Sequence, residues 1–155
     1  MSEILDEIDL RLLRCLQEDA SISMDELAGR ANLSRNACWR RVKRMEERGA
    51  IRGRVALVDP EKLGVGTLVL ANVKLSAHGR ANLEKFIESI KRLPNVLECF
   101  ILMGEQDFFL KIAVRDIYEY ERFFFKELSA IEGVAEVKSS MTLSQIKNET
   151  AYPIA

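Results

Sequence analysis

The sequence LAGRANLSRNACWRRVKRMEERG, residues 27–49, has the pattern of two short helices joined by a tight turn. Ser34 is placed as the N-cap of the second helix, because its hydroxyl can accept a hydrogen bond from a free amide of the first turn. Gly49 is placed at its end, since glycine readily takes the left-handed conformation that terminates many helices. The narrow apolar face between them consists of Cys38, Val42 and Met45. This spacing predicts a helix-turn-helix.

The opposite face of the second helix carries long polar side chains, namely Arg35, Asn36, Trp39, Arg40 and Lys43. A short helix with such a face fits the major groove of DNA, where arginine can pair with guanine and asparagine with adenine. The same pattern also describes a basic, solvated helix of an ordinary helical domain. On the pattern alone, both interpretations stay open.

The distribution of charge favours DNA binding. The chain of 155 residues has a formal net charge of −1, yet residues 35–54 carry 8 basic and 2 acidic side chains, a local charge of +6. Residues 1–34 carry 3 basic and 8 acidic side chains. Because neutralised phosphates supply most of the non-specific affinity for DNA, this local excess matters more than the overall balance. We therefore predict a recognition helix.

Two further helices complete the predicted DNA-binding unit. Residues 4–18 place Leu5, Ile8 and Leu12 on one face, and Ser23 with Glu26 forms a capping box before a helix that contains Leu27 and Ala28. Residues 1–53 are therefore expected to form a three-helix domain.

Composition excludes several other classes. The chain is 48% hydrophobic and 30% charged, typical of soluble globular proteins, and no run approaches the roughly 18 apolar residues of a membrane span. The N-terminal stretch is acidic and does not have the basic-then-apolar pattern of a signal peptide, so we expect a cytoplasmic protein. Cys15, Cys38 and Cys99 form no CxxC pair and are expected to stay reduced, with redox sensing at Cys38 an alternative. His78 precedes a glycine and is expected in a loop. We expect no catalytic residues, no metal site and no cofactor.

The second half of the chain predicts an α+β domain. Residues 51–58 have the pattern of a strand, and residues 54–66 that of a linking strand and hinge. Further strands are expected at 67–75, 96–103, 108–114 and 134–143, with helices at 81–92 and 117–130 and an extended segment at 145–152. This order is that of a ferredoxin-like βαββαβ fold over residues 67–155.

A sheet with helices on one face leaves its other face open to water or to another subunit. Apolar strand residues indicate that a second subunit covers this face. The residues that we assign to it are Leu68, Leu70, Leu97, Phe108 and Leu110.

Several motifs together resemble the Lrp/AsnC (feast/famine) family of transcription regulators over nearly the whole chain. They are LDEID (5–9), ELA (26–28), LS (33–34), CWRRVKRME (38–46), GAIRG (49–53), ALVDP (56–60), GEQD (104–107), SS (139–140) and IKNET (146–150). The resemblance implies a helix-turn-helix domain, a linking strand and a βαββαβ domain that binds amino acids. It also implies homodimers that assemble further, often to octamers, around which DNA can wrap.

The resemblance places an effector site at the turn between the second and third strands of the sheet. The residues carried over to it are Met103, Gly104, Glu105, Gln106, Asp107 and Thr150. A plain hairpin turn is the alternative explanation for Gly104 and Asp107. This chain differs from the family in having Gln106 before Asp107, and a polar amide there favours a polar effector. The CWRR run and the DPEKLG linker look most like the subgroup that responds to cysteine.

The predicted DNA-binding residues are Ser34, Arg35, Asn36, Trp39, Arg40, Lys43, Arg44, Arg52 and Arg54. Arg35, Asn36 and Arg40 are candidates for base edges, whereas Lys43, Arg44, Arg52 and Arg54 are candidates for phosphates. Trp39 can touch a thymine methyl or sugar, or pack on a neighbour. Arg41 lies off this face, and we expect it to form an ion pair with Asp6 or Asp9.

These features predict a transcriptional regulator of amino-acid metabolism that is associated with the nucleoid and modulated by a small amino acid. One alternative is an architectural protein that wraps DNA without any metabolite response. A third possibility is an amino-acid-binding regulator of an enzyme that has kept a degenerate helix-turn-helix. The +6 charge of residues 35–54 argues against it.

Overall fold

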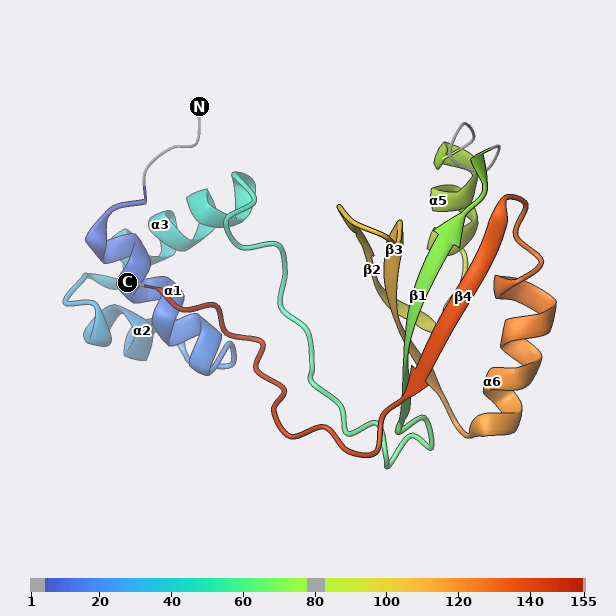
Figure 1. Ribbon diagram of the computed structural model, residues 1–155. Helices are drawn as coiled ribbons and strands as arrows, with labels where there is room; N and C mark the ends of the chain where they lie inside the picture. Colours follow the sequence, from blue (N-terminus) through green and yellow to red (C-terminus); the bar gives the residue numbers. More distant parts are fainter. Residues whose placement is uncertain (1–4, 78–82, 155) are drawn as a thin grey trace. The chain divides into compact units, whose positions relative to one another are not determined.

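The computed structural model describes residues 5–77 and 83–154, which fall into two compact units (Figure 1). The first unit comprises Met1–Leu57 and Ile146–Ala155, and the second comprises Val58–Gln145. The expectation for His78 and the start of the helix expected at residue 81 lie outside the described residues. In the described part of the chain, no helix is long and apolar enough to cross a membrane.

The first unit contains three helices, α1 (Glu7–Glu18), α2 (Met24–Arg30) and α3 (Arg35–Glu47). Ser34 caps α3 as predicted, because its hydroxyl accepts a hydrogen bond of 3.3 Å from the Ala37 amide. Gly49 has a φ of +77° directly after α3, also as predicted. Ser23 caps α2 by accepting a hydrogen bond from the Glu26 amide. The Glu26 carboxylate, however, accepts from Arg30. A reciprocal capping box occurs instead at the start of α1, between Asp6 and Asp9. The helix-turn-helix prediction is therefore confirmed.

The core of this unit is the meeting point of the three helices. Its buried residues are Leu12, Leu27, Ala28, Ala31, Cys38, Val42 and Met45. The predicted apolar face of α3 is thus buried, and the side chains on its other face remain exposed.

The segment 51–58 does not form the predicted strand. Val55 is 82% exposed and Leu57 is 75% exposed, and no strand of the described residues pairs with this segment. Alternating β-branched residues make an extended backbone favourable, but a strand also needs a neighbour to take its N–H and C=O groups. The sequence pattern therefore favours an extended backbone here, but it does not show whether a neighbouring strand is present.

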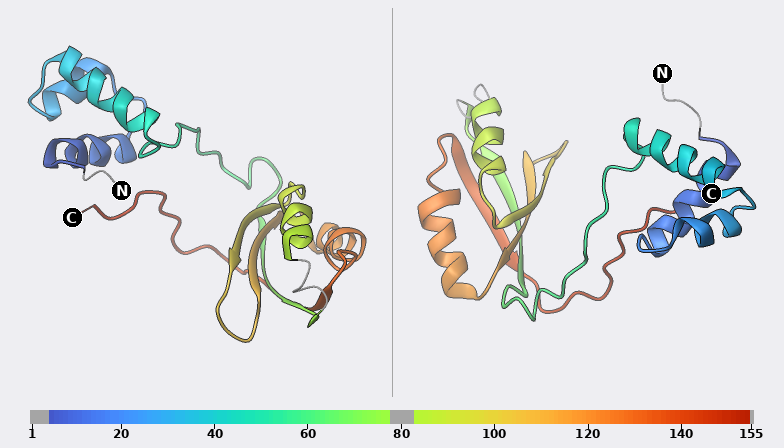
Figure 2. Two further views of the ribbon diagram at one scale, coloured as in Figure 1. Left: turned by 90° about the horizontal axis from the view of Figure 1, so that it is seen from above. Right: turned by 180° about the vertical axis from the view of Figure 1, so that it is seen from behind.

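The second unit is a four-stranded antiparallel sheet with two helices on one face (Figures 1 and 2). The strands are β1 (Thr67–Leu75), β2 (Val96–Ile101), β3 (Phe108–Val114) and β4 (Val134–Met141), in the order β2-β3-β1-β4. The helices are α5 (Leu83–Lys91) and α6 (Ile117–Phe123), and α6 continues as a π-helical turn over Phe124–Leu128. This is the predicted ferredoxin-like α+β arrangement.

The two faces of the sheet differ from the prediction in one respect. Phe108 and Leu110 were assigned to the open face, but both are buried beneath the helices with Val73 and Ala71, their partners on β1. Because side chains alternate along a strand, Leu70 and Phe109 occupy the open face. The assignment of Phe108 and Leu110 was wrong: with Ile112 and Val114 they form the wholly apolar face of β3, whereas Lys111 lies on the open face beside Phe109.

The C-terminal segment belongs to the first unit, although the sequence grouped it with the sheet domain. The Gln17 side chain donates a hydrogen bond of 3.0 Å to the Tyr152 carbonyl and accepts one of 2.7 Å from the Tyr152 amide. The Arg14 guanidinium donates to the Ile154 carbonyl at 3.5 Å. These contacts hold the chain end along α1.

Candidate DNA-binding and effector-binding sites

The exposed face of α3 is the candidate DNA-binding surface. Its helix starts at the Ser34 cap, and Arg35, Asn36, Trp39, Arg40 and Lys43 are all exposed. The buried residues Cys38, Val42 and Met45 lie on the other side of the helix. The structure therefore brings the predicted base-contacting residues together on one face.

The cations around this face differ in their internal partners. Lys43 lies over the Trp39 ring, 4.9 Å from its centre, and 3.8 Å from Glu47. Arg54 pairs with Glu46 at 3.0 Å, and Arg35 lies 3.6 Å from Asp25. Within residues 5–77 and 83–154, neither Arg40 nor Arg52 makes a hydrogen bond or ion pair. The charge of Arg40 is therefore uncompensated in the middle of the exposed face.

Arg41 forms the predicted ion pair on the rear of α3. Its Nη1 donates to Asp6 Oδ2 at 2.7 Å and to Asp9 Oδ1 at 2.8 Å. The pKa of the Asp6 carboxyl lies below its usual value, first because the Asp9 amide donates to it and second because Arg41 does. The same carboxylates raise the pKa of Arg41. Arg41 thus joins α3 to α1.

Residues 102–107 connect β2 to β3 and include the predicted effector residues Met103, Gly104, Glu105, Gln106 and Asp107. The Leu102 amide donates to the Asp107 carbonyl at 2.9 Å, and the Asp107 amide donates to the Val73 carbonyl at 3.0 Å. Asp107 Oδ2 accepts a bond of 2.7 Å from the Leu75 amide. Asp107 therefore ties the turn to the end of β1, which is a structural role that needs no ligand.

The remaining side chains of the turn are open. Met103 is fully exposed, and the Glu105 carboxylate lies 3.8 Å from the Lys138 ammonium. Gly104 does not have a positive φ, and a Cβ atom built there meets no atom within 4 Å. The hairpin geometry therefore does not require glycine at this position.

Gln106 contains an unusual polar atom. Its Oε1 is buried and accepts no hydrogen bond from any described residue. Buried acceptors are almost always satisfied, and an unsatisfied one costs about 1–3 kcal/mol. Such an atom is suited to a donor that arrives with a ligand.

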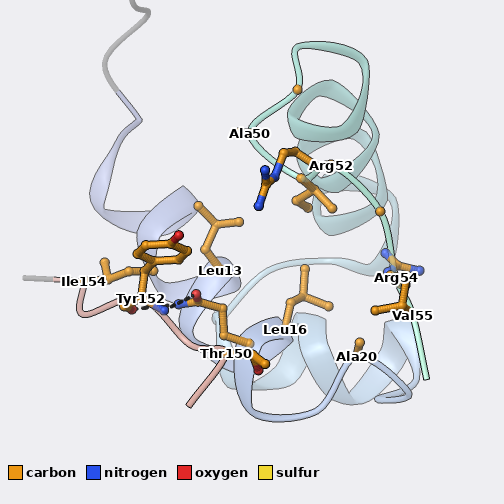
Figure 3. Close-up of a pocket in the computed structure, with 14 residues that line it drawn as sticks. Leu13, Leu16, Ala20, Ala50, Arg52, Arg54, Val55, Thr150, Tyr152 and Ile154 are labelled. Carbon is orange, nitrogen blue, oxygen red and sulfur yellow. Dashed lines mark hydrogen bonds between the residues drawn. The ribbon is translucent and has the colours of Figure 1, made fainter. Parts of the chain in front are cut away.

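Thr150 is not part of this turn's unit. It lines a cavity of about 770 Å³ in the first unit, with Thr150 and Tyr152 on the side of the chain end and Arg52 and Val55 on the side of the segment after α3 (Figure 3). The contact between Gln17 and Tyr152 that shapes this cavity was missed from the sequence, because no local pattern relates residues 135 positions apart.

The thiol of Cys38 and possible metal-ligand clusters are the remaining candidates. Cys38 is buried, and burial raises the pKa of its thiol, so it is poorly suited to redox sensing. No group of three or more His, Cys, Asp or Glu residues suited to a metal ion occurs in the described part of the chain.

A helix-turn-helix with an exposed basic face, joined to a separate α+β domain, is the arrangement of a two-domain DNA-binding regulator. Residues 5–52 match the winged helix-turn-helix DNA-binding family model, and residues 68–152 match that of the Lrp/AsnC ligand binding domain. The chain therefore belongs to the Lrp/AsnC family of transcriptional regulators.

Individual relatives match along almost their whole length. The DNA-binding transcriptional activator DecR of Escherichia coli K12 is 36% identical over 97% of this chain and 99% of its own. The transcriptional regulator AzlB of Bacillus subtilis is 38% identical over 99% and 98%. A transcriptional regulator from Neisseria meningitidis, solved as a complex with L-methionine, is 34% identical, covers 97% of each chain and has a TM-score of 0.90.

Proposed function

We propose that this regulator reads DNA with the exposed face of α3 and that a small amino acid, bound at the turn 103–107, controls this binding. The observation that carries the DNA-binding part is the uncompensated charge of Arg40, which sits on the exposed face with no internal partner among the described residues. The protein acts by binding and not by catalysis.

The proposed contacts divide into two kinds. Base edges are read by Arg35, Asn36 and Arg40, while Lys43, Arg52 and Arg54 bind phosphates, and Ser34 and Trp39 contact the backbone or a thymine methyl. The exposed ion pairs of Arg35, Lys43 and Arg54 exchange readily for phosphate, because such pairs contribute little in water. Arg44, also predicted to bind phosphate, differs from these cations because its guanidinium is bound to the buried carboxylate of Asp9.

The effector-binding part rests on Gln106. Its unsatisfied Oε1 needs a donor, and the ammonium of an amino acid supplies one. The open space around Gly104 allows a carboxylate to approach the backbone amides of the turn, and the exposed Glu105 provides a second acceptor. An amino acid as ligand is also consistent with the methionine complex of the Neisseria relative.

The open face of the sheet supports assembly into homodimers and larger oligomers. Phe100 and Phe109 lie side by side on this face, with ring centres 6.3 Å apart, and Phe100 is 50% exposed. Apolar surface of this kind is stabilised by a second copy. We propose a dimer that assembles further, up to an octamer, in the cytoplasm and in association with the nucleoid.

The DNA assignment is tested with Arg40→Ala and Lys43→Ala. Arg40→Ala should lose about 1–3 kcal/mol of binding free energy on the cognate site and little on random DNA. Lys43→Ala should weaken binding to both and reduce the slope of log K against log salt by about one. If Arg40→Ala weakens binding to all sequences equally, its assignment to a base is wrong.

The effector assignment is tested by titrating the protein with the twenty amino acids while operator binding is measured. Gln106→Leu, which keeps the size of the side chain and removes its acceptor, should abolish the response and leave DNA affinity unchanged. Gln145→Leu, the same substitution at an exposed position outside the turn, is the matched control and should keep the response. A wild-type protein that responds to no amino acid would favour the architectural alternative.

Assembly is tested by sedimentation of the full chain. Phe109→Lys, on the open face, should dissociate dimers, whereas an exposed site on α6 such as Glu121→Lys should not. An oligomer that survives Phe109→Lys would exclude this face as the interface.

A further inference from the structure

Asp9 is the buried charged residue of the described chain. It lies on α1 and only 2% of its surface is exposed. Its Oδ1 accepts from Arg41 at 2.8 Å, and its Oδ2 accepts from Arg44 at 2.8 Å. Two guanidinium groups of the recognition helix therefore meet on a single carboxylate of another helix.

The two arginines have different positions relative to the DNA-binding face. Arg41 lies on the rear of α3 and its side chain is 25% exposed. Arg44 follows Arg40 by one helical turn, on the flank of the face, and its side chain is 42% exposed. Arg44 could reach a phosphate if it turned outward, but its Nη2 is directed to Asp9 instead.

Separating this pair is more costly than separating the exposed ones. Asp9 is desolvated, so removing one donor leaves a buried charge less well compensated. The ion pairs of Arg35, Lys43 and Arg54 involve exposed carboxylates, for which water replaces the partner at little cost. Arg44 is therefore the arginine beside the face that is least free to exchange its partner for DNA.

We propose that Asp9 is a positioning residue of the DNA interface that withholds Arg44 from phosphate while Arg41 holds α3 against α1. The consequence is a lower non-specific affinity, because each withheld cation is one phosphate contact fewer, while base contacts by Arg40 are unaffected. This inference rests on the proposed role of α3 in reading DNA and is independent of the effector site.

The test is the salt dependence of binding to random duplex DNA by the full-length protein. Asp9→Asn keeps the size of the side chain and one carbonyl acceptor but removes the charge that retains Arg44. The slope of log K against log salt should become steeper by about 0.9, which corresponds to roughly 3.5-fold more loss of affinity between about 50 and 200 mM salt. Asp6→Asn is the control, because Asp6 binds Arg41 and not Arg44. Its slope should equal that of the wild type.

A second variant makes the test independent of the stability of Asp9→Asn. Arg44→Gln in the wild-type background should leave the slope unchanged, because Arg44 makes no phosphate contact there. In the Asp9→Asn background it should restore the wild-type slope.

A shallower slope for Arg44→Gln alone would overturn the inference, since Arg44 would then already bind phosphate with Asp9 as its support. An unchanged slope for a folded Asp9→Asn would also overturn it. Neither result would affect the proposed role of α3 in reading DNA, which fails if Arg40→Ala leaves cognate binding intact.

Discussion

Replacement of Asp107 separates its structural role from any contact with an effector. In the structure the carboxylate accepts the Leu75 amide at 2.7 Å, at the end of β1, and Leu75 itself is 1% exposed. Asp107→Ala removes this acceptor and offers the amide no replacement. Asp107→Asn keeps a carbonyl acceptor in the same place and removes the charge. The two variants therefore remove different amounts of the same interaction.

The magnitudes follow from this one hydrogen bond. A buried amide left without an acceptor costs about 2 kcal/mol, so Asp107→Ala should lower the unfolding temperature of the sheet unit by roughly 10 °C. A neutral acceptor forms a bond about half as strong as a charged one, so Asp107→Asn should cost about 1 kcal/mol. The Asp107 amide still donates to Val73 in both variants, so the turn remains attached to β1.

The assay is thermal unfolding of the full chain followed by circular dichroism, combined with the amino-acid titration of operator binding. We expect Asp107→Asn to keep the amino-acid response, because Gln106 and Glu105 supply the acceptors for the ligand. Equal unfolding temperatures for wild type and Asp107→Ala would refute the structural role. Loss of the response in a stable Asp107→Asn would show that the charge of Asp107 contacts the ligand.

Three further predictions concern the helical unit. Arg41→Ala should lower the free energy of unfolding by roughly 1.5–3 kcal/mol in denaturant titrations, because Asp9 loses a charge-assisted bond, whereas Arg40→Ala should leave it unchanged. The pKa of Asp6 is lowered in the fold, so its stabilisation is present above pH 3.8 and is lost as the pH falls through the lower folded pKa. Asp6→Asn should therefore flatten the acid-induced decrease in unfolding temperature below pH 3.8. Gln17→Ala should speed hydrogen exchange of the Tyr152 amide, which loses its acceptor, with little change in unfolding temperature, since both bonds that it removes are exposed.

Local features of this fold could be predicted because they depend on residues close together in the chain. The Ser34 cap, the Gly49 terminus and the apolar spacing of α3 each involve residues at most a few positions apart. The sheet elements were likewise predicted in their correct order, since strand and helix periods differ. The ion pair of Arg41 was also predicted, because its position on the rear of α3 directs it away from the DNA-binding face.

The candidate effector site was predicted by resemblance and stays a prediction. The structure adds a contact that the sequence did not indicate, because only the sheet register brings the Leu75 amide within 2.7 Å of the Asp107 carboxylate. The unsatisfied Oε1 of Gln106 could not be anticipated either, because burial of one atom depends on everything packed around it.

By itself the sequence determined the two-domain α+β plan, the recognition helix and the local concentration of positive charge, because periodicity and composition act over short distances. The tertiary structure showed which phenylalanine of β3 is buried, since Phe108 and Phe109 lie on opposite faces and the helices cover only the face of Phe108. It also decided that Arg44 turns to Asp9, 35 positions away, and that Tyr152 binds Gln17, 135 positions away. Contacts between such distant positions leave no local pattern, because they form only when the whole chain has folded.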